Sequence, residues 1–338
     1  MKRNFIYVGN AVSNDISVFQ LNDDGNAEPV QTVPFEGIMA VGNATPIAIS
    51  PDRNFLYAGI RAQPFTVLTF SIDAENGQLR QIGQGALADS MAYLSTDNSG
   101  RFLLSASYGG SVVSVNRIDA EGVANDPIQV LKTGLNAHAV RTSPDNVHVF
   151  ATNLGSDQVA AFRFDATTGT LSAGDPPHIP LPPKSGPRHF VFSPDGRFTF
   201  VIGEYSAQVL SFSYDAASGV WQPLGTASIL PDGFEGVSAS ADLKVTPDGR
   251  FLYASERTSS TIKLLRFDVA TGTLTAGDSF ATETQPRGIT LDPSGRLLAA
   301  VGELSDRMTI YAIDPDSGNL TAVSSHATGQ QPNWVEIV

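Results

Sequence analysis

The sequence contains no cysteine, few basic residues and no long apolar run. The missing cysteine excludes disulfides, thiolate zinc sites and a cysteine nucleophile. With 21 Lys and Arg against 34 Asp and Glu, the net charge is −13. This charge argues against nucleic acid or an anionic membrane surface as a partner.

Membrane and export signals are also missing. No apolar run approaches the roughly 20 residues of a membrane helix. The basic start MKRNFIYVGN has too short an apolar stretch for a signal peptide. We therefore expect a cytoplasmic location, and nothing in the sequence indicates the oligomeric state.

Several catalytic motifs are absent as well. The chain has no G-x-S-x-G elbow, no H-E-x-x-H pair, no phosphate loop and no Asp-rich calcium loop. We therefore expect no metal and no cofactor, and acid/base and electrostatic chemistry in any active site.

A repeated unit runs along the whole chain. Each copy is an apolar run, a Pro-Asp-Gly turn or a relative of it, and a second apolar run, which is typical of a tight hairpin. The first large residue after each turn serves as a marker, and successive markers lie 46 to 53 residues apart. The markers are Phe55, Phe102, His148, Phe198, Phe251 and Leu297.

This period predicts an all-β fold, a seven-bladed β-propeller of four-stranded antiparallel blades. A seventh copy is split between the termini, because NWVEIV ends the chain and MKRNFIYVGN begins it. We expect the ring to close by pairing the C-terminal innermost strand with the N-terminal strand, and residues 1–338 to form a single domain.

In such a blade, both kinds of tight turn fall on one face of the disc, so the starts of the innermost strands and the ends of the second strands meet on the other. A site at that mouth takes one residue from each blade at each of two offsets from the marker. The starts of the innermost strands are Thr45, Ala92, His138, Arg188, Ala241, Arg287 and Asn333. The ends of the second strands are Ala11, Arg61, Tyr108, Leu154, Glu204, Arg257 and Glu303.

A position set only by packing should carry similar side chains in every blade. At these two offsets the residues differ between blades, and many of them are large and polar. The four arginines suit the capture of a carboxylate or phosphate, so they predict an anionic small-molecule substrate. His138 is the candidate for proton transfer, with Glu204 as its partner. The alternative is structural: the arginines could bridge blades by pairing with Glu204 and Glu303.

Other residues near the mouth have open or structural interpretations. Tyr108 is either a hydrogen-bond donor or part of the pocket wall. His189 is expected to point to the other side of its strand as a packed, hydrogen-bonded core residue. Trp334 is expected to anchor the closing blade.

The chain resembles the seven-bladed propeller lactonase family, and most closely its bacterial 6-phosphogluconolactonase branch. The resemblance rests on GPRH with a downstream Glu, followed by SERTSS and TQPRG. It implies that His138, Arg188, Glu204 and Arg257 correspond to the active-site residues of the related carboxymuconate lactonising enzymes. One segment departs from this branch, since GVSASADLKV lacks the usual Arg and Trp.

The resemblance implies a lactonase that hydrolyses an anionic sugar-acid lactone, 6-phosphogluconolactone first among them. In this reading the catalytic residues are His138, Glu204, Arg188 and Arg257, and the substrate-binding residues are Arg287, Arg61, Tyr108, Asn333 and Glu303. Two alternatives remain open. One is a lactonase or cycloisomerase for a carboxymuconolactone or an unphosphorylated aldonolactone, and the other is a non-catalytic binding platform.

Overall fold

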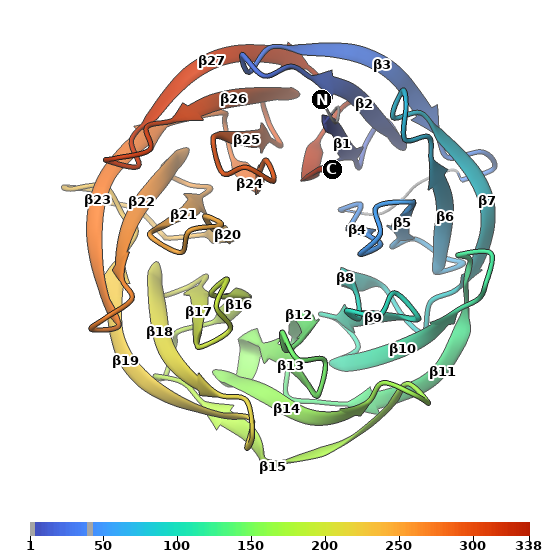
Figure 1. The fold of residues 1–338 in the computed structure, drawn as a ribbon, viewed down its shortest axis with the longest axis horizontal. Coiled ribbons are helices and arrows are strands. Elements are labelled where there is room, and N and C mark those ends of the chain that lie inside the picture. Colours follow the sequence, from blue (N-terminus) through green and yellow to red (C-terminus); the bar gives the residue numbers. More distant parts are fainter. Residues whose placement is uncertain (1–3, 39–42) are drawn as a thin grey trace.

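The structure is a computed structural model that describes residues 4–38 and 43–338. In these residues the chain forms seven four-stranded antiparallel sheets arranged radially around a central channel (Figure 1). The predicted seven-bladed propeller is therefore confirmed. No helix in the described part of the chain is long and apolar enough to cross a membrane.

The strands follow one another from the channel outward in each blade. The innermost strands are β4 (Ile47–Ile49), β8 (Met91–Thr96), β12 (Ala137–Thr142), β16 (Pro187–Phe192), β20 (Ser240–Val245), β24 (Pro286–Leu291) and β28 (Pro332–Ile337). The second strands are β1 (Asn4–Asn10), β5 (Phe55–Ile60), β9 (Phe102–Ser107), β13 (His148–Asn153), β17 (Phe198–Gly203), β21 (Phe251–Glu256) and β25 (Leu297–Gly302).

The third and outermost strands build the rim of the disc. The third strands are β2 (Asp15–Leu21), β6 (Thr66–Ile72), β10 (Val112–Ile118), β14 (Gln158–Asp165), β18 (Gln208–Asp215), β22 (Thr261–Asp268) and β26 (Arg307–Ile313). The outermost strands are β3 (Ala27–Pro34), β7 (Leu79–Ala86), β11 (Ala124–Lys132), β15 (Thr170–Pro180), β19 (Val220–Ser228), β23 (Thr273–Ala281) and β27 (Leu320–Ala327). A single 3-10 turn, η1 (Leu154–Ser156), follows β13.

The Pro-Asp-Gly segments form the expected turns between the innermost and second strands. In the turn between β16 and β17, Oδ1 of Asp195 accepts hydrogen bonds from Oγ of Ser193 at 2.6 Å and from the backbone N of Arg197 at 3.1 Å. Gly196 has φ of 70°, a conformation that glycine adopts without steric cost. Local side-chain bonding and one left-handed residue therefore fix each hairpin.

The ring closes as predicted. The strand β28 pairs antiparallel with β1, with Val335 opposite Val8 and Ile337 opposite Ile6. The closing blade consequently contains both ends of the described chain, in the order β28-β1-β2-β3. Closure in this way leaves no open sheet edge between the first and last blades.

Marker residues pack between blades. Phe198 on β17 packs edge-on against Phe267 of the next blade, with ring centroids 4.9 Å apart. His148 replaces the aromatic marker on β13, and its Nδ1 lies 3.0 Å from the hydroxyl of Tyr214 in the next blade. His148 is thus part of the contact between two blades, far from the channel.

A second repeated contact joins neighbouring blades. The hydroxyl of Tyr253 on β21 donates to the carbonyl of Gly318 in an outer turn of the next blade at 2.7 Å. The same bond joins Tyr57 to Gly122 at 2.9 Å. A buried tyrosine hydroxyl is stable only with such a partner, so the contact fixes how adjacent blades meet.

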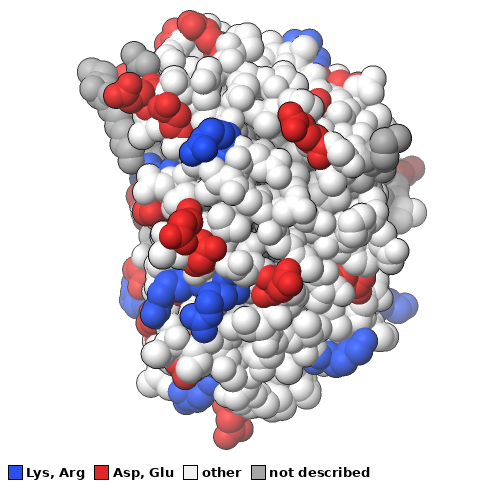
Figure 2. Space-filling model, turned by 90° about the vertical axis from the view of Figure 1, so that its right-hand side faces the viewer, with Lys and Arg blue, Asp and Glu red and all other residues white. Residues whose placement is uncertain are grey.

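The side of the disc seen in Figure 2 carries acidic and basic residues interspersed among uncharged ones. No continuous basic surface is visible on that side.

Candidate active site

The innermost strands begin with a β-bulge. The pairing register shifts between Pro187 and Phe190 on β16, and comparable shifts occur at the starts of β8, β12, β20 and β24. A bulge interrupts the alternation of side chains between the two faces of a strand. Two consecutive residues of an innermost strand can therefore both reach the channel.

Glu204, directly after β17, lies between two arginines. Its Oε2 is 2.9 Å from Nε of Arg188, and its Oε1 is 3.0 Å from Nη2 of Arg257. The contact with Nε lies off the N–H direction, so it is an ion pair without a well-aligned hydrogen bond. The structure thus brings together three of the four residues predicted to be catalytic.

Arg188 is almost fully buried, with a side chain only 2% exposed. Its Nη1 also donates to the carbonyl of Ala241 on the neighbouring innermost strand β20. Burial and the adjacent Arg257 lower the pKa of Arg188 to about 9, so the guanidinium is still protonated at neutral pH. A buried cation so close to a second one requires negative charge beside it, and Glu204 supplies only one carboxylate.

Arg257 is fixed by backbone groups as well as by Glu204. Its Nε donates to the carbonyl of Ala239 at 2.9 Å, and its side chain is 17% exposed. The Arg257 guanidinium therefore reaches the mouth while its base is anchored in the loop before β20.

His138, at the start of β12, is buried at the same mouth. Its Nδ1 has no hydrogen-bond partner among the described residues, and its ring packs edge-on against that of Tyr108, with centroids 6.1 Å apart. Burial, followed by the Arg188 guanidinium, holds the pKa of His138 well below its ordinary value. His138 is therefore neutral at neutral pH and able to accept a proton.

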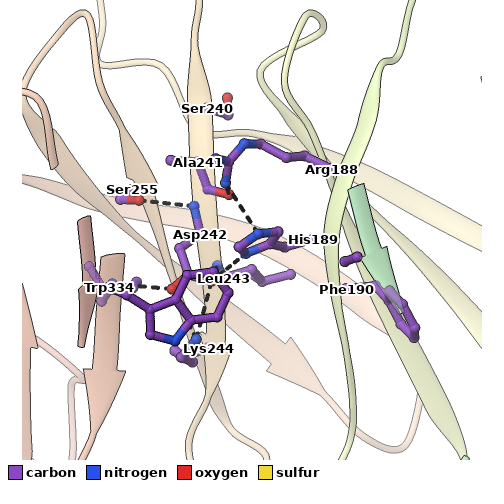
Figure 3. A network of polar contacts seen from close by, with 12 residues as sticks. Arg188, His189, Phe190, Ser240, Ala241, Asp242, Leu243, Lys244, Ser255 and Trp334 are labelled. Carbon is purple, nitrogen blue, oxygen red and sulfur yellow. Dashed lines mark hydrogen bonds and ion pairs between the residues drawn. The ribbon is translucent and has the colours of Figure 1, made fainter. Parts of the chain in front are cut away.

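The expectation for His189 is wrong in one respect. His189 is packed and hydrogen-bonded, but it points to the same side as Arg188 instead of the opposite one, because the bulge in β16 breaks the alternation. Its Nδ1 lies 2.8 Å from Oδ1 of Asp242, and its Nε2 lies 3.4 Å from Nη1 of Arg188 (Figure 3). Its ring packs edge-on against that of His138 at 5.2 Å.

Asp242 and Lys244 were not predicted, and both belong to this network. Asp242 on β20 accepts hydrogen bonds from Nζ of Lys244 at 2.9 Å and from the backbone N of Ile289 at 3.1 Å (Figure 3). Burial opposes ionisation of Asp242, but Lys244 and His189 outweigh it and hold the carboxyl pKa far below its usual range. The sequence does contain a signal for Asp242, because it is a charged residue in a strand expected to be apolar, one position after Ala241.

Arg287 and Glu303 form an ion pair, as the structural alternative predicted, but both belong to one blade, so this pair does not bridge two blades. Nη1 of Arg287 donates to Oε1 of Glu303 at 2.9 Å, and Nε2 of Gln285 donates to Oε2 at 2.8 Å. The Glu303 side chain is only 2% exposed, so both of its oxygens are occupied inside the protein. Glu303 holds Arg287 at the mouth, and its own contact with a substrate stays a prediction.

Asn333 and Trp334 come from the closing strand β28. The Asn333 side chain accepts from the backbone N of Thr45 at 2.8 Å and donates to the carbonyl of Gln331 at 2.9 Å. Trp334 packs edge-on against Tyr93 at 5.3 Å and donates through Nε1 to Glu336 at 2.9 Å. Trp334 therefore extends across the channel. It also packs against the hydrophobic core of the blades.

Two cavities lie along the channel. The smaller, about 10 Å³, has room for about one water and touches His138, Arg188 and His189. The larger, about 560 Å³, lies toward the turn face and is lined by Arg141 and Lys244 among others. His138 and Arg188 of the predicted mouth therefore border a cavity that is narrow in this structure.

The residues that the structure describes contain no group of three or more His, Cys, Asp or Glu side chains placed to hold a metal ion. The polar groups at the mouth are arginines, histidines and glutamates. Such groups bind anions, shift protons and stabilise negative charge.

The fold is a seven-bladed propeller, and arginines, histidines and glutamates gather at one end of its channel. The family described as "Lactonase, 7-bladed beta-propeller" matches residues 35–337. The chain is 38% identical over 286 residues to the 6-phosphogluconolactonase of Pectobacterium atrosepticum, covering 85% of this chain and 84% of that protein. It is 34% identical to the 6-phosphogluconolactonase of Klebsiella pneumoniae, with the same coverage.

Among solved structures, the periplasmic gluconolactonase of Pseudomonas aeruginosa matches with a TM-score of 0.91. The identity is 28%, and the match covers 99% of both chains. The chain therefore belongs to the seven-bladed β-propeller lactonase family, a family of carboxylic ester hydrolases. This assignment favours an enzyme over a non-catalytic binding platform.

Proposed function

We propose that this protein hydrolyses 6-phosphogluconolactone to 6-phosphogluconate, using His138, Arg188 and Arg257 as its catalytic residues and Glu204 as the residue that positions the two arginines. The observation that carries the proposal is the position of Glu204 between the two arginines, at the same mouth as a buried His138 whose pKa is depressed. The substrate is supported by the names of the curated relatives, which are 34% to 38% identical to this chain.

In this proposal, Arg188 and Arg257 bind the lactone carbonyl oxygen. When water attacks the carbonyl carbon, that oxygen gains negative charge. Two guanidinium groups fixed by Glu204 and by backbone carbonyls need no reorganisation to stabilise this charge. Glu204 acts as the positioning group, because it separates two cations that would otherwise repel each other.

His138 moves the proton. The neutral imidazole takes a proton from the attacking water as the C–O bond to the water oxygen forms. The tetrahedral intermediate then collapses, the bond between the carbonyl carbon and the ring oxygen breaks, and His138 returns the proton to that ring oxygen. The product is a hydroxy acid, which releases one proton to solvent at neutral pH.

A second substrate class is supported by one observation. The structure of the P. aeruginosa gluconolactonase matches this chain over 99% of its length, so an unphosphorylated aldonolactone is the alternative. A carboxymuconolactone, in either the hydrolytic or the lactonising direction, would use the same arginines because a carboxylate binds them as phosphate does.

The proposed location is the cytoplasm. A phosphorylated sugar lactone is charged and does not cross a lipid bilayer unaided, so its hydrolase works in the compartment where it is made. A gluconolactonase has no such constraint, and the P. aeruginosa protein is periplasmic.

The test is the initial rate of proton release from freshly made 6-phosphogluconolactone, with gluconolactone and a carboxymuconolactone alongside. Wild type is compared with His138→Ala and with His178→Ala, a control histidine on the exposed outer strand β15. Spontaneous hydrolysis is subtracted in each case. We expect fast wild-type turnover, loss of at least about 100-fold in His138→Ala, and no change in His178→Ala.

Turnover of only the unphosphorylated lactone would move the protein to the second class and keep the mechanism. Equal rates in wild type and His138→Ala would show that the assigned mouth is wrong.

A further inference from the structure

The four arginines at the mouth differ in their partners. Arg188 and Arg257 share Glu204, and Arg287 pairs with Glu303. Among the described residues, Arg61 has no carboxylate within ion-pair distance. Its one hydrogen bond runs from Nε to Oγ of Ser90 at 3.3 Å.

Asp89, next to Ser90, acts to raise the pKa of Arg61 but forms no ion pair with it among the described contacts. Oδ2 of Asp89 accepts from Oγ of Ser107 at 3.0 Å, and Oδ1 accepts from the backbone N of Ser90 at 2.7 Å. Asp89 is thus occupied by hydroxyl and backbone donors. Nη1 and Nη2 of Arg61 are left without a described partner.

Arg61 and Arg287 flank the closing blade, which contributes Asn333 between them. Burial and then the positive charge of Arg287 lower the pKa of Arg61 to about 10. The two guanidinium groups are therefore close enough to repel each other. Nε and Nη2 of Arg287 also lack a described partner, because its contacts with Glu303 and Asn43 both run through Nη1.

The charges of the mouth do not balance. Four arginines stand against the two glutamates that pair with them and the more distant Asp89, which leaves an excess of one positive charge. A phosphate monoester carries close to two negative charges at neutral pH, whereas an aldonolactone without phosphate carries none. Partly buried, mutually repelling guanidinium groups with unused N–H donors are stabilised by such a dianion.

We propose that Arg61 and Arg287 form a phosphate subsite, separate from the lactone-binding pair Arg188 and Arg257, and that this subsite selects phosphorylated sugar lactones. The inference rests on the proposed lactonase function and adds its specificity. Arg61 is the specificity-determining residue, since Arg287 is already paired with Glu303.

The test compares kcat/KM for 6-phosphogluconolactone and for gluconolactone in wild type and in Arg61→Gln. We expect the ratio of the two values to fall by about 10- to 100-fold in Arg61→Gln, the range for loss of a hydrogen bond to a charged group. Arg197→Gln is the matched control, because Arg197 is an exposed arginine in a Pro-Asp-Gly turn on the other face, paired with Asp195. The control is expected to keep the wild-type ratio.

An equal fall for both lactones would overturn the inference, since Arg61 would then act on the lactone group itself. An unchanged ratio would overturn it as well. Failure of the proposed function gives a different result, namely no turnover of 6-phosphogluconolactone by wild type.

Product binding tests the subsite without turnover. Calorimetric titration of wild type is expected to show tighter binding of 6-phosphogluconate than of gluconate, and Arg61→Gln is expected to reduce that difference at least 10-fold. Equal affinity of wild type for the two acids would reject the phosphate subsite, whatever the catalytic result.

Discussion

Nδ1 of His189 lies 2.8 Å from Oδ1 of Asp242, in a contact between the innermost strands of two neighbouring blades. Because an ionised carboxylate only accepts hydrogen bonds, Nδ1 must carry the proton and Nε2 must be the acceptor. That acceptor faces Nη1 of Arg188 at 3.4 Å. Asp242 therefore orients Arg188 through a neutral histidine, just below the ion pair with Glu204.

Asp242→Asn is expected to destabilise the fold by about 3 kcal/mol, because it leaves Lys244 and His189 without a buried charge partner. Denaturant unfolding measures the change. Asp195→Asn is the control, since the ion pair of Asp195 with Arg197 is exposed and is expected to contribute less than about 1 kcal/mol. Equal losses in the two variants would contradict a structural role for the network.

Stability is expected to fall as the pH drops below about 6.5. Burial, followed by Arg188, lowers the pKa of His189 to about 3 in the folded protein, whereas the unfolded chain has the ordinary value of 6.5. Between these values the unfolded state binds a proton that the folded state does not, so the free energy of unfolding decreases with decreasing pH. Above pH 6.5 both states carry neutral histidine and this contribution vanishes.

The measurement is a series of denaturant unfolding curves between pH 7.5 and pH 4. His189→Gln removes the titrating group while keeping an amide donor for Asp242. Its stability is expected to depend less steeply on pH than that of wild type. The same slope in both proteins would show that His189 does not remain neutral in the folded state.

The rate of hydrolysis is expected to stay constant from neutral pH to well below pH 6.5. His138 must be neutral to accept a proton, and burial together with Arg188 holds its pKa well below the ordinary value. Profiles of kcat/KM against pH, corrected for spontaneous hydrolysis, locate the acidic limb. A limb at or above pH 6.5 would mean that another group, or a more solvated histidine, takes the proton.

The sequence predicts the propeller because the period and the turns repeat in every blade. It also predicts that Glu204 and Glu303 lie at the mouth with the arginines, since the polar residues stand at fixed distances from the turns, and it offers their ion pairs as an alternative to substrate binding. The contribution of His189 could not be predicted from strict alternation, because the bulge in β16 depends on pairing with β17. Asp242 was missed for the same reason, as it lies one residue beyond the position compared between blades.

Tyr253→Phe is expected to destabilise the protein by about 1 kcal/mol. The substitution removes the hydroxyl that donates to the Gly318 carbonyl and leaves that buried acceptor without its partner. Thermal or denaturant unfolding measures the loss. Tyr57→Phe removes the equivalent bond to Gly122 elsewhere in the ring, and the two losses are expected to add. A stabilised or unchanged Tyr253→Phe protein would show that the hydroxyl contributes nothing between blades.

The closing blade is joined by the hydrogen bonds between β28 and β1, where the other blades have a covalent turn between innermost and second strand. The ring can therefore open at this seam without cutting the chain. Opening would carry Asn333 and Trp334 away from the channel, so an enzyme that is warmed or mildly denatured is expected to lose its catalytic surface while the six other blades still hold their sheets. Inactivation is therefore expected to precede melting and to report on the seam.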